Sequence, residues 1–127
     1  MGEILIIGMG GFIGAILRYQ ISGYVQGFTK SDVFPYDTLA VNVLGSFVIG
    51  LMFYFVESRG TLDPQVRAFV LIGALGAFTT FSTFSIETLN FLLNGEIQWA
   101  IFNLTANCFL GLLAAWMGRM LPVLVWR

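Results

Sequence analysis

The sequence predicts an all-α integral membrane protein with four transmembrane helices. Of its 127 residues, 57% are hydrophobic and only 10% are charged, and the mean hydropathy is +0.86. A soluble domain of this length carries about a quarter charged residues, because its surface must stay hydrated. Too little polar surface is left here to cover a water-facing globule. Lipid must therefore be the solvent for most of the chain.

Four segments are long and apolar enough to cross a membrane, which takes about 20 mostly apolar residues as a helix. We expect spans at about residues 4–24, 38–56, 67–93 and 98–125. Polar connections lie between them, and each contains turn-forming residues such as Pro35, Pro64 or Gly95. These connections are too short for a soluble domain. We therefore expect residues 1–127 to form a single multi-pass domain in the cell membrane.

The composition also excludes several classes of function. A formal net charge of −1 provides no basic surface for nucleic acid. Cys108 is the single cysteine and histidine is absent, so neither an internal disulfide nor the usual nucleophile–base pairs of hydrolases can form. We therefore do not expect an enzyme. Nor does the N-terminus read as a cleaved signal, since Glu3 stands where Lys or Arg would be expected.

Basic residues near the expected membrane ends give only a weak orientation signal. They form two sets: on one side Arg59, Arg67, Arg119 and Arg127, and on the other Arg18 and Lys30. The positive-inside rule therefore favours cytoplasmic termini slightly. A mixture of insertion topologies is compatible with so small a difference.

Glycines in the first span partly match the pattern of a dinucleotide-binding loop, but the match is incomplete. The spacing that begins at Gly8 and Gly10 requires a third glycine where Ile13 stands, and no βαβ unit follows. We instead predict that Gly10 and Gly14 form a face of small residues where helix backbones approach closely. The same spacing recurs as Ser46/Gly50 and Gly111/Ala115.

Polar residues recur every four positions on two spans, which places each set on one helix face. The sets are Thr38, Asn42 and Ser46 on the second span, and Asn103, Asn107 and Gly111 on the fourth. The two faces can line a path for a polar solute. Alternatively, they join the helices through hydrogen bonds worth about 0.6–2 kcal/mol each. For Asn42 and Asn107 both readings stay open.

The third span departs from an ordinary transmembrane helix between residues 73 and 85. This stretch holds five hydroxyl residues and two glycines, and residues of these kinds sustain a helix poorly. We predict that the third helix is broken near its middle. A break frees backbone groups that need a partner subunit, water or an ion, and it is a recurrent way to build ion sites in membranes. An intact helix packed through small residues is the alternative.

Phe81 and Phe84 lie three residues apart and therefore share a face in helical geometry. Most phenylalanines in membrane helices only pack. Aromatic rings, however, have electropositive edges. Ring edges set among hydroxyl groups can coordinate a small anion less tightly than Arg or Lys would, as conduction requires.

Apart from Arg67 and Arg119, which are counted among the residues near the membrane ends, two charged residues fall within the expected spans. Glu87 follows the predicted break by about one turn and is costly if it faces lipid while ionised. We expect it to be protonated, bonded to hydroxyls such as that of Thr83, or exposed to a vestibule. Arg18, in the outer part of the first span, can extend its guanidinium to the interface or attract anions.

With these residues identified, the chain resembles the Fluc-type (CrcB-like) fluoride channels over essentially its full length. Three sets of residues carry the resemblance: Gly10 and Gly14 with Arg18, the segment from Thr38 through Asn42 to Gly45, and Gly73 to Ser85 followed by Glu87. The T-T-F-S-T-F-S string at positions 79–85 is long and chemically unusual. The match is therefore specific.

The resemblance implies an antiparallel, dual-topology dimer with two fluoride pathways and a central structural sodium ion. A homodimer is expected, and a heterodimer with a sister chain is the alternative. Backbone carbonyls of Gly76 and Thr79 would bind sodium, Phe81 and Phe84 would present ring edges, and Asn42 would donate a hydrogen bond to fluoride. The other residues implied to lie along or beside the path are Ser82, Thr83, Glu87, Asn103, Asn107 and Arg18. The chain departs from the family pattern at Ala77, where a second glycine is common, and at Asn103 and Asn107, where Ser or Tyr is common.

The function implied is passive, fluoride-selective export that protects against fluoride toxicity. Fluoride enters from acidic surroundings as HF and dissociates in the cytoplasm, and the membrane potential drives the anion out at about 2.3 kcal/mol per charge per 100 mV. The main alternative is a small dual-topology, proton-coupled efflux transporter. Such a transporter is expected to carry a carboxylate in its first span, whereas Glu87 lies in the third. A structural subunit that transports nothing is the other alternative.

Overall fold

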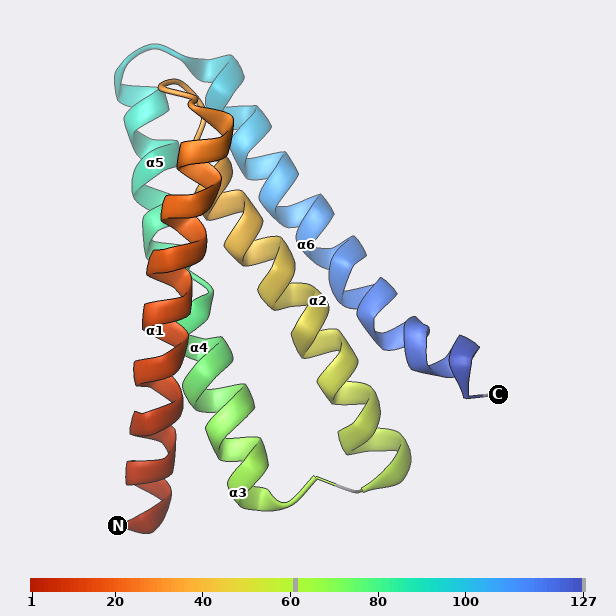
Figure 1. Ribbon diagram of the computed structural model, residues 1–127. Helices are drawn as coiled ribbons and strands as arrows, with labels where there is room; N and C mark the ends of the chain where they lie inside the picture. Colours follow the sequence, from red (N-terminus) through yellow and green to blue (C-terminus); the bar gives the residue numbers. More distant parts are fainter. Residues whose placement is uncertain (61, 127) are drawn as a thin grey trace.

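The computed structural model describes residues 1–60 and 62–126, and all the regular structure in these ranges is helical. Four helical stretches are long and apolar enough to cross a membrane: Gly2–Thr29, Tyr36–Ser58, Pro64–Leu93 and Ile97–Val125. This confirms the prediction of an all-α, multi-pass membrane protein (Figure 1). Arg127, part of the expected orientation signal, lies outside the described residues, and the side chain of Arg59 is also not described.

The first two long helices end at residues with left-handed backbone. Helix α1 (Gly2–Thr29) stops at Lys30, whose φ is 49° and whose N–H donates to the carbonyl of Gln26 at 2.8 Å. Helix α2 (Tyr36–Arg59) stops at Gly60, whose φ of 55° costs glycine little because it has no Cβ. Both ends therefore satisfy a common helix-stop geometry.

The third stretch consists of several short elements. Asp63 begins α3 (Pro64–Arg67) by accepting a hydrogen bond from the N–H of Gln65 at 2.7 Å, and Pro64 fits the first helical position. A π-helix, η1 (Ala68–Leu75), and α4 (Gly76–Phe78) follow, and then Thr79 and Thr80 have extended backbone. Helix α5 (Phe81–Leu93) completes the stretch, and α6 (Ile97–Val125) follows after a turn with Gly95 at φ 75°.

Helix α1 packs on η1 through direct contact of the two backbones. A Cβ added at Gly10 would lie 2.2 Å from the carbonyl oxygen of Phe69, and one at Gly14 would lie 2.1 Å from that of Ala74. From the other side, a Cβ at Gly73 would lie 2.5 Å from the carbonyl oxygen of Ile7. The prediction that Gly10 and Gly14 form a packing face is confirmed.

Helices α2 and α6 form the second closely packed pair. A Cβ at Gly50 would lie 2.0 Å from the carbonyl oxygen of Ala115, and one at Gly118 would lie 2.1 Å from that of Phe47. Ser46 lies opposite Gly111, at 3.5 Å from the Cβ position. The two small-residue pairs predicted on separate helices therefore face each other.

The connection between α1 and α2 is fixed by an aromatic cluster at one end of the molecule. The ring of Phe34 is only 3% exposed and contacts Phe102 and Trp99, with ring centroids 4.9 and 5.6 Å apart.

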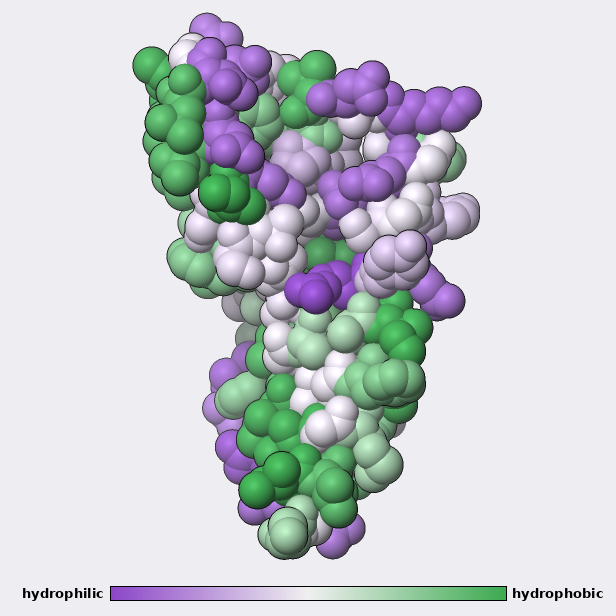
Figure 2. Space-filling view, turned by 90° about the vertical axis from the view of Figure 1, so that its left-hand side faces the viewer, coloured by the Kyte–Doolittle hydropathy of each residue, from purple (hydrophilic) through white to green (hydrophobic). Residues whose placement is uncertain are grey.

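At the other end, α1 with η1 and α2 with α6 separate into two arms (Figure 1). On the face that Figure 2 shows, hydrophilic residues gather at the end with the cluster, whereas the opposite half is mainly hydrophobic.

Candidate functional site

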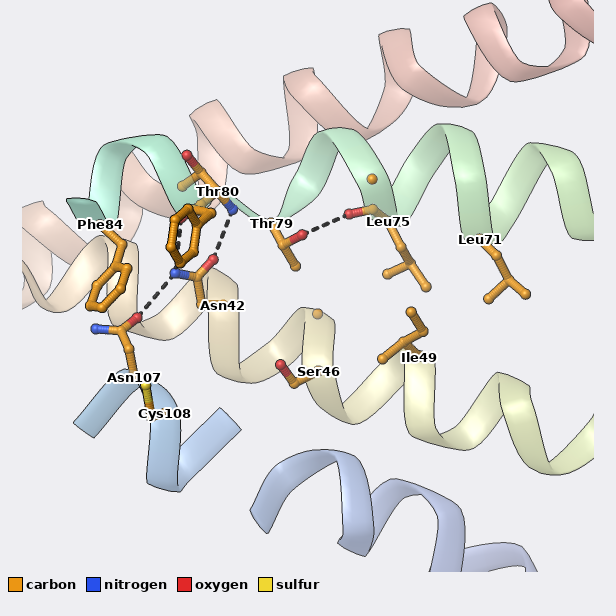
Figure 3. Close-up of a pocket in the computed structure, with 13 residues that line it drawn as sticks. Asn42, Ser46, Ile49, Leu71, Leu75, Thr79, Thr80, Phe84, Asn107 and Cys108 are labelled. Carbon is orange, nitrogen blue, oxygen red and sulfur yellow. Dashed lines mark hydrogen bonds between the residues drawn. The ribbon is translucent and has the colours of Figure 1, made fainter. Parts of the chain in front are cut away.

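The extended pair Thr79–Thr80 is held by a side chain of α2. The backbone angles are φ −81° and ψ 154° at Thr79, and φ −143° and ψ 110° at Thr80. Asn42 Oδ1 accepts from the N–H of Thr80 at 2.8 Å, and Asn42 Nδ2 donates to the carbonyl of Thr80 at 3.2 Å. The amide therefore pairs with both backbone groups of Thr80, as a neighbouring strand would (Figure 3).

Two carbonyls near this pair lose the donors that a continuous helix would supply. In such a helix the N–H of Thr80 would bond the carbonyl of Gly76, and the N–H of Thr83 would bond that of Thr79. Here the first N–H goes to Asn42, and the second goes to the hydroxyl of Thr80 at 3.2 Å, which caps α5. The carbonyl oxygens of Gly76 and Thr79 are therefore left without these donors.

A series of amide hydrogen bonds connects Asn42 to α6 and back to α5. Asn42 Nδ2 also donates to Asn107 Oδ1 at 3.0 Å, and Asn107 Nδ2 donates to Asn103 Oδ1 at 3.0 Å. Asn103 Nδ2 then donates to the hydroxyl of Thr88 at 3.0 Å. The two polar faces predicted on the second and fourth spans therefore meet. Thr88 was not predicted as a site residue from the sequence, although it follows Phe84 by one helical turn.

The two phenylalanines adjoin this series. Phe81 is 79% exposed and Phe84 only 6%, and their ring centroids are 5.6 Å apart. The prediction that they share a face is confirmed. Both rings line an open pocket of about 370 Å³, together with Asn42, Asn107 and Gly76. Figure 3 shows Asn42 between Thr80 and Asn107 in this pocket.

Hydroxyl groups continue on the other side of Thr80. The Thr80 hydroxyl donates to that of Thr83 at 2.9 Å and lies 3.5 Å from that of Ser82. Thr80 and Thr83 line a second pocket of about 470 Å³, which Arg18 also lines. Thr80 is therefore shared by the two pockets, and Arg18 lies along the second one.

The hydroxyl partner of Glu87 is not Thr83, the example given from the sequence. Thr38 on α2 donates to Glu87 Oε1 at 2.5 Å, whereas Thr83 bonds Thr80. The expectation of a hydroxyl partner is confirmed, but the hydroxyl is that of Thr38 and not of Thr83, which bonds Thr80 within the cap of α5. Within the described residues Glu87 Oε2 is buried without a hydrogen-bond partner, and Glu87 lines a third pocket of about 430 Å³.

These features define a small multi-pass membrane protein in which amide side chains hold an extended segment of the third helical stretch. Residues 5–119 match the family model described as "CrcB-like protein, Camphor Resistance (CrcB)". The chain belongs to this family.

Several curated relatives are similar over nearly their whole length. One from Sulfurovum sp. (strain NBC37-1) is 48% identical over 93% of this chain and 91% of its own. One from Magnetococcus marinus is 42% identical over 97% and 99%, and one from Campylobacter jejuni is 46% identical over 93% and 95%. Each is named "Fluoride-specific ion channel FluC". The expectation that this chain is not an enzyme agrees with these names and is confirmed.

Proposed function

We propose that this chain forms a fluoride-selective ion channel that releases fluoride passively from the cytoplasm and so protects against fluoride toxicity. The observation that carries the proposal is the 42–48% identity, over nearly the full length, to relatives named as fluoride-specific channels. The pocket chemistry supports it. Aromatic ring edges suit a small anion, and among the described residues no fixed cation lines the pocket at Phe81 to hold the anion too tightly.

The pathway we propose follows the residues around the extended pair. Asn42, Phe81 and Phe84 line it, and Asn107 adjoins them. On the far side, Thr83 and Arg18 line the adjoining pocket, where Arg18 attracts anions, and the Ser82 hydroxyl lies 3.5 Å from that of Thr80. Glu87 lines the third pocket. Asn103 supports the path from within α6.

We also propose a central structural sodium ion at the carbonyl oxygens of Gly76 and Thr79. These oxygens fit the role because their helical donors are directed to Asn42 and to the Thr80 hydroxyl. Carbonyl oxygens of unwound helical segments are suitable sodium ligands in membrane proteins. The ion would supply positive charge near the anion path without a protonated side chain.

The assembly we propose is an antiparallel homodimer with two pores. Phe81 supports it, because a ring that is 79% exposed beside a polar pocket is incompletely covered by its own chain. A second subunit of opposite orientation would cover this ring. A heterodimer with a sister chain would use the same surface.

Fluoride efflux from liposomes tests the function. The purified chain is reconstituted into vesicles loaded with potassium fluoride, valinomycin is added, and a fluoride electrode follows the release, with chloride-loaded vesicles as the ion control. We expect rapid fluoride release without chloride release. Phe81→Ile should abolish it, whereas Phe12→Ile, at a 68% exposed phenylalanine of α1, should not.

The alternative outcomes separate the candidate functions. Release that requires a proton gradient would support a coupled transporter instead of a channel. Absence of release from vesicles that contain the intact chain alone, and also after co-expression with a sister chain, would refute the channel.

A further inference from the structure

The amide series between α2, α6 and α5 has a fixed direction. The Thr88 hydroxyl donates to the carbonyl of Phe84 at 2.8 Å, and a carbonyl can only accept. The single hydroxyl proton is used in this bond, so toward Asn103 the Thr88 oxygen must accept. Asn103 must therefore turn its NH2 group to Thr88 and its oxygen toward Asn107.

The orientation of the Asn42 amide is fixed from both ends of the series. Because Asn103 presents its oxygens, Asn107 turns its NH2 group to them, at 2.9 Å from the carbonyl and 3.0 Å from Oδ1, and its own oxygen to Asn42. From the other end, the N–H of Thr80 requires the oxygen of Asn42, which leaves the NH2 group for Asn107. A reversed Asn107 would set its NH2 group against that of Asn42 and displace the latter from Thr80.

Two members of the series are remote from the pocket at Phe81. Asn103 is 0% exposed, and neither Asn103 nor Thr88 lines the pocket that Asn42 and Asn107 line. A group so placed acts on a solute in that pocket only through its neighbours. The buried NH2 group of Asn103 also needs a hydrogen-bond partner, since an unpaired buried donor is unfavourable.

We propose that Thr88 and Asn103 are positioning residues, which fix the orientation of the Asn107 amide and, through it, hold Asn42 on Thr80. The effect on transport rests on the proposed channel function, whereas the effect on amide orientation does not. Thr88 is the residue to test, because its hydroxyl oxygen is the last acceptor in the series and can be removed with little change in volume.

Side-chain amide NMR tests the orientation directly. The five asparagines of the full chain are labelled with ¹⁵N in detergent micelles. In Thr88→Val we expect the side-chain signals of Asn103, Asn107 and Asn42 all to move, and Thr88→Ser should restore them. The signals of Asn90 and Asn94, outside the series, should not move. A change confined to Asn103 would overturn the proposal.

The control variant is Thr29→Val. The hydroxyl of Thr29 makes the same kind of bond, 2.8 Å to the carbonyl of Val25, but it is exposed and, within the described residues, bonds no side-chain amide. This substitution should leave the signals of Asn42 and Asn107 unchanged. Thr88→Ala replaces Thr88→Val if the valine variant does not elute as a folded protein on size exclusion.

Fluoride efflux provides the second readout. We expect Thr88→Val to slow release about tenfold, because the loss of one buried partner disturbs the series, with Thr88→Ser and Thr29→Val close to the unsubstituted chain. Equal rates for Thr88→Val and the unsubstituted chain would overturn the proposal. A lack of fluoride release by the unsubstituted chain would instead refute the channel function, and the NMR result would then decide the positioning role alone.

Discussion

The side-chain amide of Asn42 pairs with both the N–H and the carbonyl of Thr80, at 2.8 and 3.2 Å. One side chain of α2 thereby satisfies the backbone of an extended residue in a segment that is otherwise helical. Because unsatisfied backbone groups cost several kcal/mol in lipid, this pairing supports the extended conformation. The same amide reaches Asn107, so the extended segment, α2 and α6 are coupled through Asn42.

Replacement of Asn42 by aspartate should abolish fluoride release. A carboxylate cannot donate to the carbonyl of Thr80 or to Asn107, and it adds a negative charge beside the pocket. Each buried group left unpaired costs about 1–3 kcal/mol, so we expect a loss of about two orders of magnitude in efflux rate. Gln98→Glu, which makes the same amide-to-carboxylate change at an exposed residue in the first turn of α6, should release fluoride normally. Normal efflux from Asn42→Asp would contradict the assigned path.

Gly45 on α2 lies against Thr79, so a substitution at Gly45 tests the extended segment. A Cβ at Gly45 would lie 2.2 Å from Cγ2 of Thr79. Gly45→Ala should therefore displace Thr79 and reduce efflux about tenfold. Thr79→Ser removes that methyl group but keeps the hydroxyl that donates to the carbonyl of Leu75. The double variant should recover most of the rate, and failure to recover would show that Thr79 is not the residue that matters.

The contact between α1 and η1 should be intolerant of even a methyl group. Gly14→Ala would place a Cβ 2.1 Å from the carbonyl oxygen of Ala74, and a backbone atom cannot rotate away as a side chain can. We expect a loss of about 1–3 kcal/mol in stability, measured as a lower thermal unfolding temperature in detergent. Gly23→Ala, in the same helix, is the matched control, because beyond the local helix backbone no atom of the described residues lies within 4 Å of the added Cβ. Its stability should be unchanged or slightly raised, because alanine favours the helix.

The hydrogen bond from the Thr38 hydroxyl to Glu87 should stabilise the folded protein. Thr38 is buried, and Glu87 Oε2 has no partner within the described residues, so loss of the hydroxyl would leave both carboxylate oxygens unpaired. Thr38→Val should lower the free energy of unfolding by about 1–3 kcal/mol. Thr38→Ser should restore most of it. Equal stability of the valine and serine variants, measured by thermal unfolding, would show that the hydrogen bond is unimportant.

Much of the fold was predictable because lipid imposes simple rules on a sequence. Apolar length sets the four helical stretches, and close packing of membrane helices requires small residues such as Gly14 and Gly50. Their partners were not predictable. That Gly14 meets Ala74 and Gly50 meets Ala115 depends on which helices become neighbours. The π-helix η1, whose backbone packs against α1, was also not predicted from the sequence.

The sequence by itself determined that this chain is a multi-pass helical membrane protein, and it marked the hydroxyl-rich third stretch and the asparagines as the polar groups to explain. Only the tertiary structure decided how these groups pair. Hydrogen bonds between residues such as Asn42 and Asn107, 65 positions apart, depend on helix orientation and not on local spacing. For the same reason Glu87 bonds Thr38 on another helix, because a polar group away from water takes whichever partner the packing brings within reach.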